Sequence, residues 1–395
     1  MLELFKSVYH FCIAIVANVW FGFPARALTI IGVTGTDGKT TTTTIIYEIL
    51  KRAKIKASMI TSVHAVIAGR SYDTGFHVTT PTAWAVQKYL HDALAFGDTH
   101  VVLEVTSHAL GQSRVLGIPF RVGVITNVTH EHLDWHGTFK NYLATKLSLF
   151  KRSAIAVVNR DEADLYAAAI PIIKMKRYVT YGIRRDSIVN PKSHPFKTLL
   201  PGEFNRYNLL AAIATAEALG VKPIIWRRAI ATFKGVVGRM EIMIKKPFVV
   251  IVDFAHTPNA LNSALKTVRN MTKKRVIHVF GSAGLRDRSK RPMMGAASAV
   301  YADISIITEE DYRTEDVETI ISEIASGISD GKTVYKFPNR HDAIAFALKI
   351  AEAGDVVIIT GKGHEKSLCR GTVEYPWSDQ KEVKSILKNL NRYAS

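Results

Sequence analysis

Short apolar runs rich in β-branched residues alternate with helical segments from residue 28 onward. This alternation is typical of α/β proteins built on parallel sheets. We therefore predict an α/β fold whose strands are Leu28–Val33, Ala57–Thr61, His100–Val105, Val122–Thr126, Ile155–Val158, Phe248–Asp253, Arg275–Phe280, Ile304–Thr308 and Val356–Thr360.

These strands form two series, and a glycine-punctuated stretch, Gly235–Arg239, separates them. Glycine clusters of this kind interrupt regular structure, so we place a domain boundary there. The segment around Tyr178–Lys197 contains several prolines and glycines and is expected to form a peripheral hairpin.

The N-terminal segment is apolar, because Ser7–Ala25 contains no Lys, Arg, Asp or Glu. Ala25-Arg26-Ala27 resembles a signal-peptidase site. Two features argue against a signal peptide: the acidic Glu3 lies where signal peptides carry basic residues, and cleavage would fall directly before the first strand. His10 and Asn18 interrupt a membrane span. We predict a helix lying on the protein body, with a helix lying on a membrane face as the alternative.

The strongest local signal is the run Gly35-Thr36-Asp37-Gly38-Lys39-Thr40-Thr41 between the first strand and a helix-like run. Glycines let backbone N–H groups close around phosphate oxygens, and the helix N-terminus adds partial positive charge. Lys39 would contact the terminal phosphates, and the Thr40 hydroxyl would bind Mg²⁺. The general pattern has its first glycine where Val33 stands. The run nevertheless predicts a phosphate-binding loop.

Composition narrows the alternatives. The chain has 395 residues, 47% hydrophobic and 22% charged, as in ordinary globular proteins with two or three domains. Its two cysteines, Cys12 and Cys369, argue against a disulfide framework or a zinc site and suit a reducing cytoplasm. The net charge of +18 would attract an anionic partner, which could be nucleic acid, an anionic membrane or a polyanionic substrate. No nucleic-acid motif is present and the basic residues are scattered, so we favour solvated basic faces.

Acidic and histidine residues follow two further strands. Glu104 ends one predicted strand, and the next is followed by His130, His132 and His136. Ligands of open α/β sheets gather at the carboxyl ends of strands, so Glu104 is well placed to hold Mg²⁺. The histidines lack the helical spacing of a zinc protease and have no cysteine partner. The cluster favours a metal–phosphate site.

Together these segments resemble the Mur ligase family. The resemblance rests on the loop from Gly35 to Thr41, on Glu104–Leu110, and on Asn127 with His132 and Asp134. It continues through Thr79-Thr80-Pro81, Asn141-Tyr142, Lys146, Leu149-Phe150, Phe204–Asn208, Gly238–Glu241, Val252–Pro258, Arg286-Asp287, Lys290-Arg291-Pro292 and Gly361–Glu365. Among family members the chain is most similar to the UDP-N-acetylmuramyl-tripeptide synthetases, which add the third peptide residue to a peptidoglycan precursor.

The resemblance implies an ATP-dependent amide-bond ligase that works through an acyl phosphate. It implies three parts: an apolar helical segment (1–27), a P-loop central domain with a parallel sheet (28–238) and a Rossmann-like C-terminal domain (239–395). Lys39, Glu104, His132 and Lys146 would be catalytic. Thr40 and Glu104 would hold one Mg²⁺, and His132 with a carbamylated Lys146 would hold a second. The implied nucleotide contacts are Gly35, Thr36, Asp37, Gly38, Lys39, Thr40, Thr41, Asn127, Asn205, Asn208, Arg239 and Asp253.

The resemblance also implies substrate contacts. Thr79, Thr80, Ser107 and Arg114 match positions that hold the muramyl-peptide acceptor. Where diaminopimelate-adding members carry Asp-Asn-Pro-Arg, this chain has Glu310-Asp311-Tyr312-Arg313, so the arginine is kept and its neighbours differ. An arginine can grip a distal carboxylate, which favours diaminopimelate over lysine. The other implied amino-acid contacts are Arg286, Asp311, Gly361 and Glu365.

One departure from the family is the N-terminal side. Members usually carry a UDP-binding domain before the phosphate loop, whereas about thirty residues precede it here.

We expect a monomeric cytoplasmic enzyme that binds no nucleic acid, and peripheral membrane contact through residues 7–25 stays open. The alternatives are a ligase acting on a polyglutamate-, cyanophycin- or pseudomurein-type acceptor, and a non-catalytic nucleotide-binding scaffold of cell-wall assembly. A nucleic-acid-dependent ATPase is suggested by charge alone.

Overall fold

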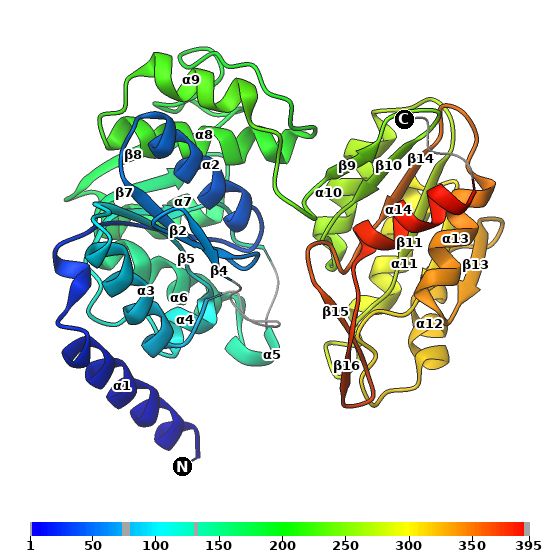
Figure 1. The fold of residues 1–395 in the computed structure, drawn as a ribbon, viewed down its shortest axis with the longest axis horizontal. Helices are drawn as coiled ribbons and strands as arrows, with labels where there is room; N and C mark the ends of the chain where they lie inside the picture. Colours follow the sequence, from blue (N-terminus) through cyan, green and yellow to red (C-terminus); the bar gives the residue numbers. More distant parts are fainter. Residues whose placement is uncertain (1, 73–79, 130–132, 391–395) are drawn as a thin grey trace. The chain divides into compact units, whose positions relative to one another are not determined.

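The chain folds into two compact units, Met1–Lys234 and Gly235–Ser395. The computed structural model describes residues 2–72, 80–129 and 133–390 (Figure 1). Each unit has its own sheet, covered by helices, and its own buried core. The fold is α/β in both units, as predicted.

The first unit is built on an eight-stranded sheet in the order β4-β3-β2-β5-β1-β6-β7-β8. Six neighbouring strands from β2 to β8 pair in parallel, while β3 and β4 add an antiparallel edge. The strands are β1 (Thr29–Thr34), β2 (Ala57–Ile60), β3 (Ala65–Ile67), β4 (Arg70–Tyr72), β5 (His100–Glu104), β6 (Phe120–Ile125), β7 (Ser153–Asn159) and β8 (Arg177–Tyr181).

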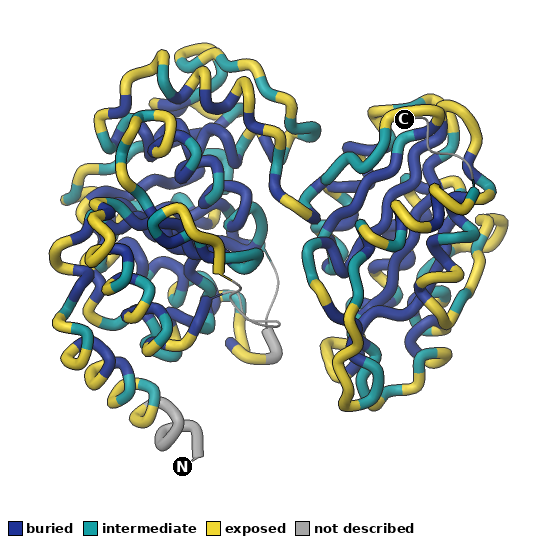
Figure 2. Tube along the Cα trace, viewed as in Figure 1, coloured by how far each residue is buried: buried dark blue, intermediate teal, exposed yellow. Residues whose placement is uncertain are grey.

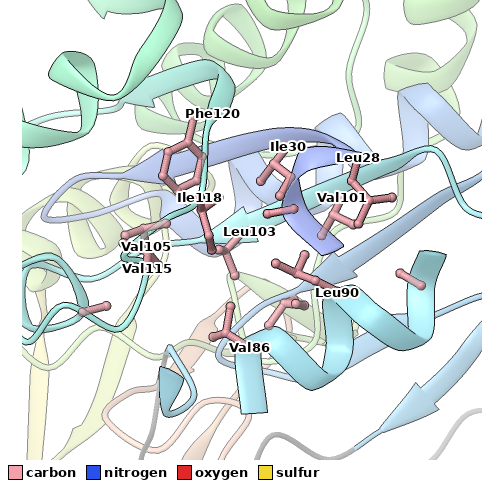
Figure 3. Close-up of a cluster of buried hydrophobic side chains, with 14 of the residues drawn as sticks. Leu28, Ile30, Val86, Leu90, Val101, Leu103, Val105, Val115, Ile118 and Phe120 are labelled. Carbon is pink, nitrogen blue, oxygen red and sulfur yellow. The ribbon is translucent and has the colours of Figure 1, made fainter. Parts of the chain in front are cut away.

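Helices cover both faces of this sheet. Helices α2 and α8 pack together on one face, and α3, α4 and α6 lie on the other (Figure 1). On the α3 side, Ile30 and Leu103 from the central strands meet Val86 and Leu90 in a buried apolar cluster (Figure 3). The helices are α1 (Leu2–Trp20), the 3₁₀ turn η1 (Pro24–Arg26), α2 (Lys39–Arg52), α3 (Ala83–Ala95), α4 (Ser107–Gly111), α5 (Leu133–His136), α6 (Phe139–Lys151), α7 (Ala163–Ile173), α8 (Glu203–Ala218) and α9 (Pro223–Thr232).

The second unit has a six-stranded sheet in the order β13-β12-β11-β14-β10-β9, parallel except for the edge strand β9. The interiors of its four central strands, β12, β11, β14 and β10, are buried (Figure 2). Helices α13 and α14 bury apolar side chains on one face. The elements are β9 (Glu241–Ile244), β10 (Val249–Val252), α10 (Pro258–Arg269), β11 (Val276–Phe280), α11 (Lys290–Tyr301), β12 (Ile304–Thr308), α12 (Val317–Ala325), β13 (Thr333–Phe337), α13 (Arg340–Ile350), β14 (Val356–Ile359), the hairpin β15 (Ser367–Arg370) with β16 (Val373–Pro376), and α14 (Asp379–Asn389).

The predicted hairpin around Tyr178–Lys197 is wrong. The strand β8 pairs in parallel with β7 and extends the sheet, and no antiparallel partner follows it. The reason is a tertiary contact. The carboxylate of Asp161 accepts hydrogen bonds from the backbone N–H groups of Ile183, Arg184 and Arg185, which fixes a turn directly after β8.

The N-terminal segment is helical and packs against α3 in the first unit. Of its described side chains, Ala14, Ala17 and Asn18 are buried. Within the described part of the chain, no helix is long and apolar enough to cross a membrane.

Candidate active site

The phosphate loop joins the central strand β1 to α2, and its two glycines are required by close contacts. Gly35 has a φ of 153°, and a Cβ there would lie 1.8 Å from the Thr126 hydroxyl oxygen. Gly38 has a φ of 80°, and a Cβ there would lie 2.1 Å from Oδ1 of Asn208. Any L side chain would therefore clash at both positions and strain the backbone.

Residues after β6 hold this loop in place. Oδ1 of Asn127 accepts a hydrogen bond from the backbone N–H of Asp37 at 2.8 Å. The Thr126 hydroxyl donates to the Asp37 carbonyl at 2.6 Å, and the Asn127 carbonyl accepts from Thr36 N–H. Nζ of Lys39 lies over the loop and donates to the Thr36 carbonyl at 2.7 Å. The loop is thus shaped by its neighbours, with its lysine close to its backbone.

A cluster of oxygen atoms lies beside the start of α2. The Thr40 hydroxyl donates to the carboxylate of Glu104, 3.0 and 3.1 Å from its two oxygens, and Glu104 is almost fully buried. The hydroxyl of Ser62 lies 3.0 Å from that of Thr40, and Ser62 N–H donates to the carboxylate. Carboxylate and hydroxyl oxygens are hard ligands that suit Mg²⁺. The donor set therefore fits a magnesium ion, although the described residues contain no group of three or more His, Cys, Asp or Glu that could hold a metal.

Helix α6 brings Lys146 to the same loop. Its side chain is 1% exposed, and Nζ donates to the Gly35 carbonyl at 2.7 Å. The amine also lies 4.5 Å from the centre of the Tyr142 ring, whose hydroxyl is 3.1 Å from that of Thr36. A lysine placed in this way can act on phosphate directly or after modification. The carbamate itself stays a prediction.

Helix α8 borders the loop on the other side. Asn208 is buried, with Oδ1 3.4 Å from the Thr42 hydroxyl and Nδ2 donating to Oδ1 of Asn205. Nδ2 of Asn205 donates to the Pro201 carbonyl. These two amides are brought together next to the loop.

Two of the predicted acceptor contacts, Thr80 and Arg114, are linked by hydrogen bonds to each other and, through Thr80, to the backbone of Glu104. The Thr80 hydroxyl donates to the Glu104 carbonyl and accepts from Thr106 N–H. Arg114 donates to the Thr80 carbonyl at 2.6 Å, and burial lowers the pKa of its guanidinium. Ser107 is buried at the first residue of α4. Thr79 and His132, two other predicted site residues, lie outside the described residues.

In the second unit, Arg239 and Asp253 are adjacent. Asp253 accepts hydrogen bonds from Met240 N–H at 2.6 Å and from Ala255 N–H at 2.8 Å. Burial raises the pKa of its carboxyl, although the backbone donors and Arg239 oppose the shift. The Arg239 guanidinium lies 4.2 Å from the centre of the Phe254 ring.

Further charged side chains lie at the carboxyl edge of the second sheet. Nζ of Lys362 is fully buried and pairs with Asp311 at 2.7 Å and with Glu365 at 2.5 Å. Burial alone would lower the pKa of Lys362, but Glu365 and Asp311 raise it. Nη1 of Arg313 donates to the Gly284 carbonyl at 2.6 Å. Arg313 has a φ of 55°, an uncommon conformation for a non-glycine residue.

Glu310 is the exception in this cluster. Its carboxylate is buried, Oε2 has no hydrogen-bond partner among the described residues, and burial raises its pKa. Gly361, at a φ of 103°, leaves space beside it, because a Cβ there would lie 2.7 Å from Oε2. Arg286 is exposed in the loop that also supplies the Gly284 carbonyl. An unpaired buried carboxylate is costly and invites a cationic partner.

Sequence reasoning missed several of these residues. Ser62 carries a weak signal, since it directly follows the predicted strand Ala57–Thr61. Lys362 and Tyr142 lie within segments that carry the family resemblance, but the resemblance implies no role for either residue. Glu310 was treated only as a neighbour of Arg313. Their partners are far away in the chain, so no local pattern marks them.

Comparisons with known proteins agree with these features. A family model described as Mur ligase middle domain matches residues 33–216, and one described as Mur ligase, glutamate ligase domain, matches residues 238–363. A UDP-N-acetylmuramoyl-L-alanyl-D-glutamate–2,6-diaminopimelate ligase from Aquifex aeolicus is 38% identical over 389 residues, 94% of this chain and 80% of the relative. A UDP-N-acetylmuramyl-tripeptide synthetase from Roseiflexus is 37% identical, covering 96% and 82%.

Solved structures give the same picture. A diaminopimelate ligase of the same description superposes with a TM-score of 0.64 at 31% identity, over 92% of this chain and 79% of the other. A pseudomurein peptide ligase type C from Methanothermus fervidus reaches 0.68 at 19% identity, over 92% and 79%, which shows a shared fold alone.

Proposed function

Because the chain belongs to the Mur ligase family, we propose that it adds an amino acid, diaminopimelate or another diamino acid, to a muramyl-peptide cell-wall precursor at the expense of ATP. The acceptor carboxylate attacks the γ-phosphate, giving an acyl phosphate and ADP. The amine of the incoming amino acid then attacks the acyl carbon, forms the amide and releases phosphate. Phosphate is needed because a free carboxylate is a poor electrophile with no good leaving group.

The observation that carries this proposal is the convergence on the phosphate loop. Lys39 on α2, Glu104 at the end of β5 and Lys146 on α6 all meet the loop through direct contacts or through Thr40. Lys39 and the loop N–H groups would bind and neutralise the transferring phosphate, which is the main task of the protein in phosphoryl transfer. A non-catalytic scaffold would not need to keep these side chains together.

Two Mg²⁺ ions belong to the proposal. Thr40 and Glu104 would hold one, with Ser62 beside them. His132 and a carbamylated Lys146 would hold the other, since CO₂ addition turns the lysine cation into an anionic ligand. Bound magnesium supplies positive charge that neutralises phosphate oxygens. Around it, the buried Glu104 carboxylate and the loop amides fix where the nucleotide lies.

The remaining roles follow the family match. Asn205 and Asn208 would contact the adenine side, Arg239 a phosphate, and Asp253 the ribose or a magnesium-bound water. Thr79, Thr80, Ser107 and Arg114 would hold the acceptor. Arg114 suits this role because its guanidinium is already oriented by Thr80 and by Gln112.

The amino-acid choice rests on Arg313. Its guanidinium is held by one bond from Nη1 to Gly284, and its remaining donors suit a distal carboxylate. Glu310 offers a carboxylate to an ammonium group, because its Oε2 accepts no hydrogen bond within the described residues. Glu365, which already pairs with Lys362, is proposed as a further contact. Arg286, Asp311 and Gly361 complete the proposed set. A guanidinium for the distal carboxylate and carboxylates for the ammonium groups together favour a diamino-dicarboxylic acid over lysine.

We further propose that the enzyme is monomeric and cytoplasmic. The second candidate function is ligation to a different acceptor, of polyglutamate, cyanophycin or pseudomurein type. A pseudomurein peptide ligase shares the fold of this chain, and at 19% identity the likeness concerns the fold alone.

The test is an amino-acid screen for phosphate release with a muramyl-dipeptide acceptor, run with and without its UDP group. We expect release that depends on both acceptor and diaminopimelate, and that is absent in Lys39→Ala. Release with a glutamyl or aspartyl acceptor instead would support the second candidate. Acceptor-independent hydrolysis stimulated by DNA or RNA would contradict both.

A further inference from the structure

Over its described side chains, residues 8–20, helix α1 presents most of its bulky residues outward and its small ones inward. The buried positions are Ala14, Ala17 and Asn18, whereas the outward ones are 43–73% exposed. A helix that only packs on its own protein turns its large apolar residues toward the core. The outward set consists of Val8, Tyr9, Phe11, Ile15, Val16, Val19 and Trp20.

Specific contacts fix this orientation. Nδ2 of Asn18 donates to the Leu116 carbonyl at 3.0 Å and to the Ala14 carbonyl at 2.7 Å. Gly117 allows the approach, because a Cβ there would lie 2.8 Å from Oδ1 of Asn18. Rotating the helix to bury the bulky side would break the hydrogen bond to Leu116, whereas the bond to Ala14 lies within α1 and would turn with it.

Aromatic rings extend the outward surface at the C-terminal end of α1. Trp20 is 73% exposed, and its ring centre lies 5.8 Å from that of Trp84 on α3. Phe21 packs against the same Trp84 ring at 5.1 Å. Tryptophan is favoured at the boundary between bilayer headgroups and acyl chains, where its ring meets both environments.

The charges around this surface are complementary to an anionic partner. Residues 1–36 contain Lys6 and Arg26 and a single acidic residue, Glu3. The one acidic residue of α3, Asp92, is paired with Lys88. The whole unit Met1–Lys234 contains 28 Lys and Arg against 15 Asp and Glu, whereas the rest of the chain contains 24 against 19.

We propose that α1 lies in the plane of an anionic bilayer surface, with its outward face at the boundary between headgroups and acyl chains. This surface is distinct from the ligase site and does not depend on the proposed reaction. The helix lies on the bilayer, since no described helix can span one. Its apolar side chains provide the burial, and the basic unit provides attraction that acts within a Debye length of the lipid surface.

The experiment is co-sedimentation of the full chain with vesicles of phosphatidylcholine, with and without phosphatidylglycerol. We expect binding to the anionic vesicles that weakens as salt is raised, and at least a tenfold loss in Val16→Glu. The matched control is Met175→Glu, which makes the same charge change at an 89% exposed position outside α1 and should bind normally. Ligase turnover with a water-soluble acceptor should be the same in all three proteins.

Lipid contact is checked independently of any variant. Brominated acyl chains should quench tryptophan fluorescence in the unmutated chain, and Trp20→Phe should lose much of this quenching. Equal sedimentation of Val16→Glu and the unmutated chain, or no quenching, would overturn the proposal. A concentration-dependent dimer that Val16→Glu dissociates, without vesicle binding, would instead assign this face to a second copy of the chain.

Discussion

The two units of the chain arrange charge differently around their proposed site residues. In Met1–Lys234, the phosphate loop is held by backbone groups, hydroxyls and amides, and Lys39 donates to a carbonyl rather than to a carboxylate. In Gly235–Ser395, charged side chains pair with each other, as in the buried set of Lys362, Asp311 and Glu365. Among the described residues no carboxylate pairs with Lys39, so its positive charge stays available for a polyanion. In the second unit, most of the charge on these residues is neutralised before a ligand arrives.

This difference predicts different consequences of mutation. A phosphate-site cation that pairs with no carboxylate can be removed with little effect on folding, so its loss should appear in catalysis. A buried ion pair behaves otherwise, because removing one partner leaves an uncompensated charge. Changes in the second site should therefore alter both stability and selectivity. Four experiments can break or sharpen this comparison.

The largest effect is expected for Lys39→Ala. One charge-assisted contact to a transferring phosphate is worth ~3–4 kcal/mol in the transition state, so turnover should fall roughly a hundredfold to a thousandfold or more. Thermal unfolding should barely change. The measurement is phosphate release at saturating ATP, with the exposed Lys51→Ala on the same helix as control. Near-normal turnover would remove Lys39 from the phosphate site.

The next effect is expected for Lys146→Ala. Loss of a magnesium ligand should lower turnover by roughly a hundredfold, and short carboxylates should restore part of it by refilling the anionic position. Lys140→Ala, an exposed change on the same helix, is the control. Carbon-13 NMR in labelled bicarbonate tests for the carbamate directly. Full activity of Lys146→Ala would exclude the residue, and the absence of both carboxylate rescue and a carbamate signal would assign it as a simple cation.

A smaller, selective effect is expected for Arg313→Ala. A hydrogen bond to a charged group contributes ~1.5–3 kcal/mol, so kcat/KM for diaminopimelate should fall roughly tenfold to a hundredfold. The kcat/KM for lysine should change little. The surface change Arg288→Ala should leave the kcat/KM values for both amino acids unchanged. If the unmutated enzyme uses the two amino acids equally, Arg313 does not select the distal carboxylate.

The smallest effect concerns acid stability of the second unit. His278 is buried between the Ser298 and Thr360 hydroxyls, and burial, with Arg340, lowers its pKa to about 3. The unfolded chain takes up a proton near pH 6.5, whereas the folded unit does not. Stability is therefore complete above pH 6.5 and falls as the pH drops toward 3, by about 2 kcal/mol at pH 5.

Hydrogen exchange of the β11 and β14 amides at pH 7 and pH 5, corrected for intrinsic exchange rates, measures this loss. His278→Gln should flatten the pH dependence between pH 6.5 and 5, even if it lowers stability at pH 7. The exposed His341→Gln is the matched control. An unchanged pH dependence in His278→Gln would assign the acid sensitivity to other groups.

Much of the fold follows from local pattern. The predicted strand Leu28–Val33 corresponds to β1 (Thr29–Thr34), and Ile304–Thr308 agrees with β12, because buried parallel strands are continuous apolar runs. The small edge elements β3, β4 and the β15–β16 hairpin were not predicted, since each strand is only three or four residues long and β4 and β16 are exposed. The turn after β8 depends on Asp161, a residue about twenty positions earlier, and no local pattern could supply it.

The sequence by itself determined the phosphate loop, the order of the strands along the chain and the family, because glycine spacing and apolar runs are local properties. Only the tertiary structure decided which side chains meet. Ser62 joins Thr40 and Glu104 from the loop after β2, Lys146 reaches Gly35 from 111 residues away, and Lys362 neutralises Asp311. The orientation of α1 was also settled there, by its packing on α3 and by the hydrogen bond from Asn18 to the Leu116 carbonyl. Pairing energies between distant groups depend on packing, and packing is a property of the whole unit.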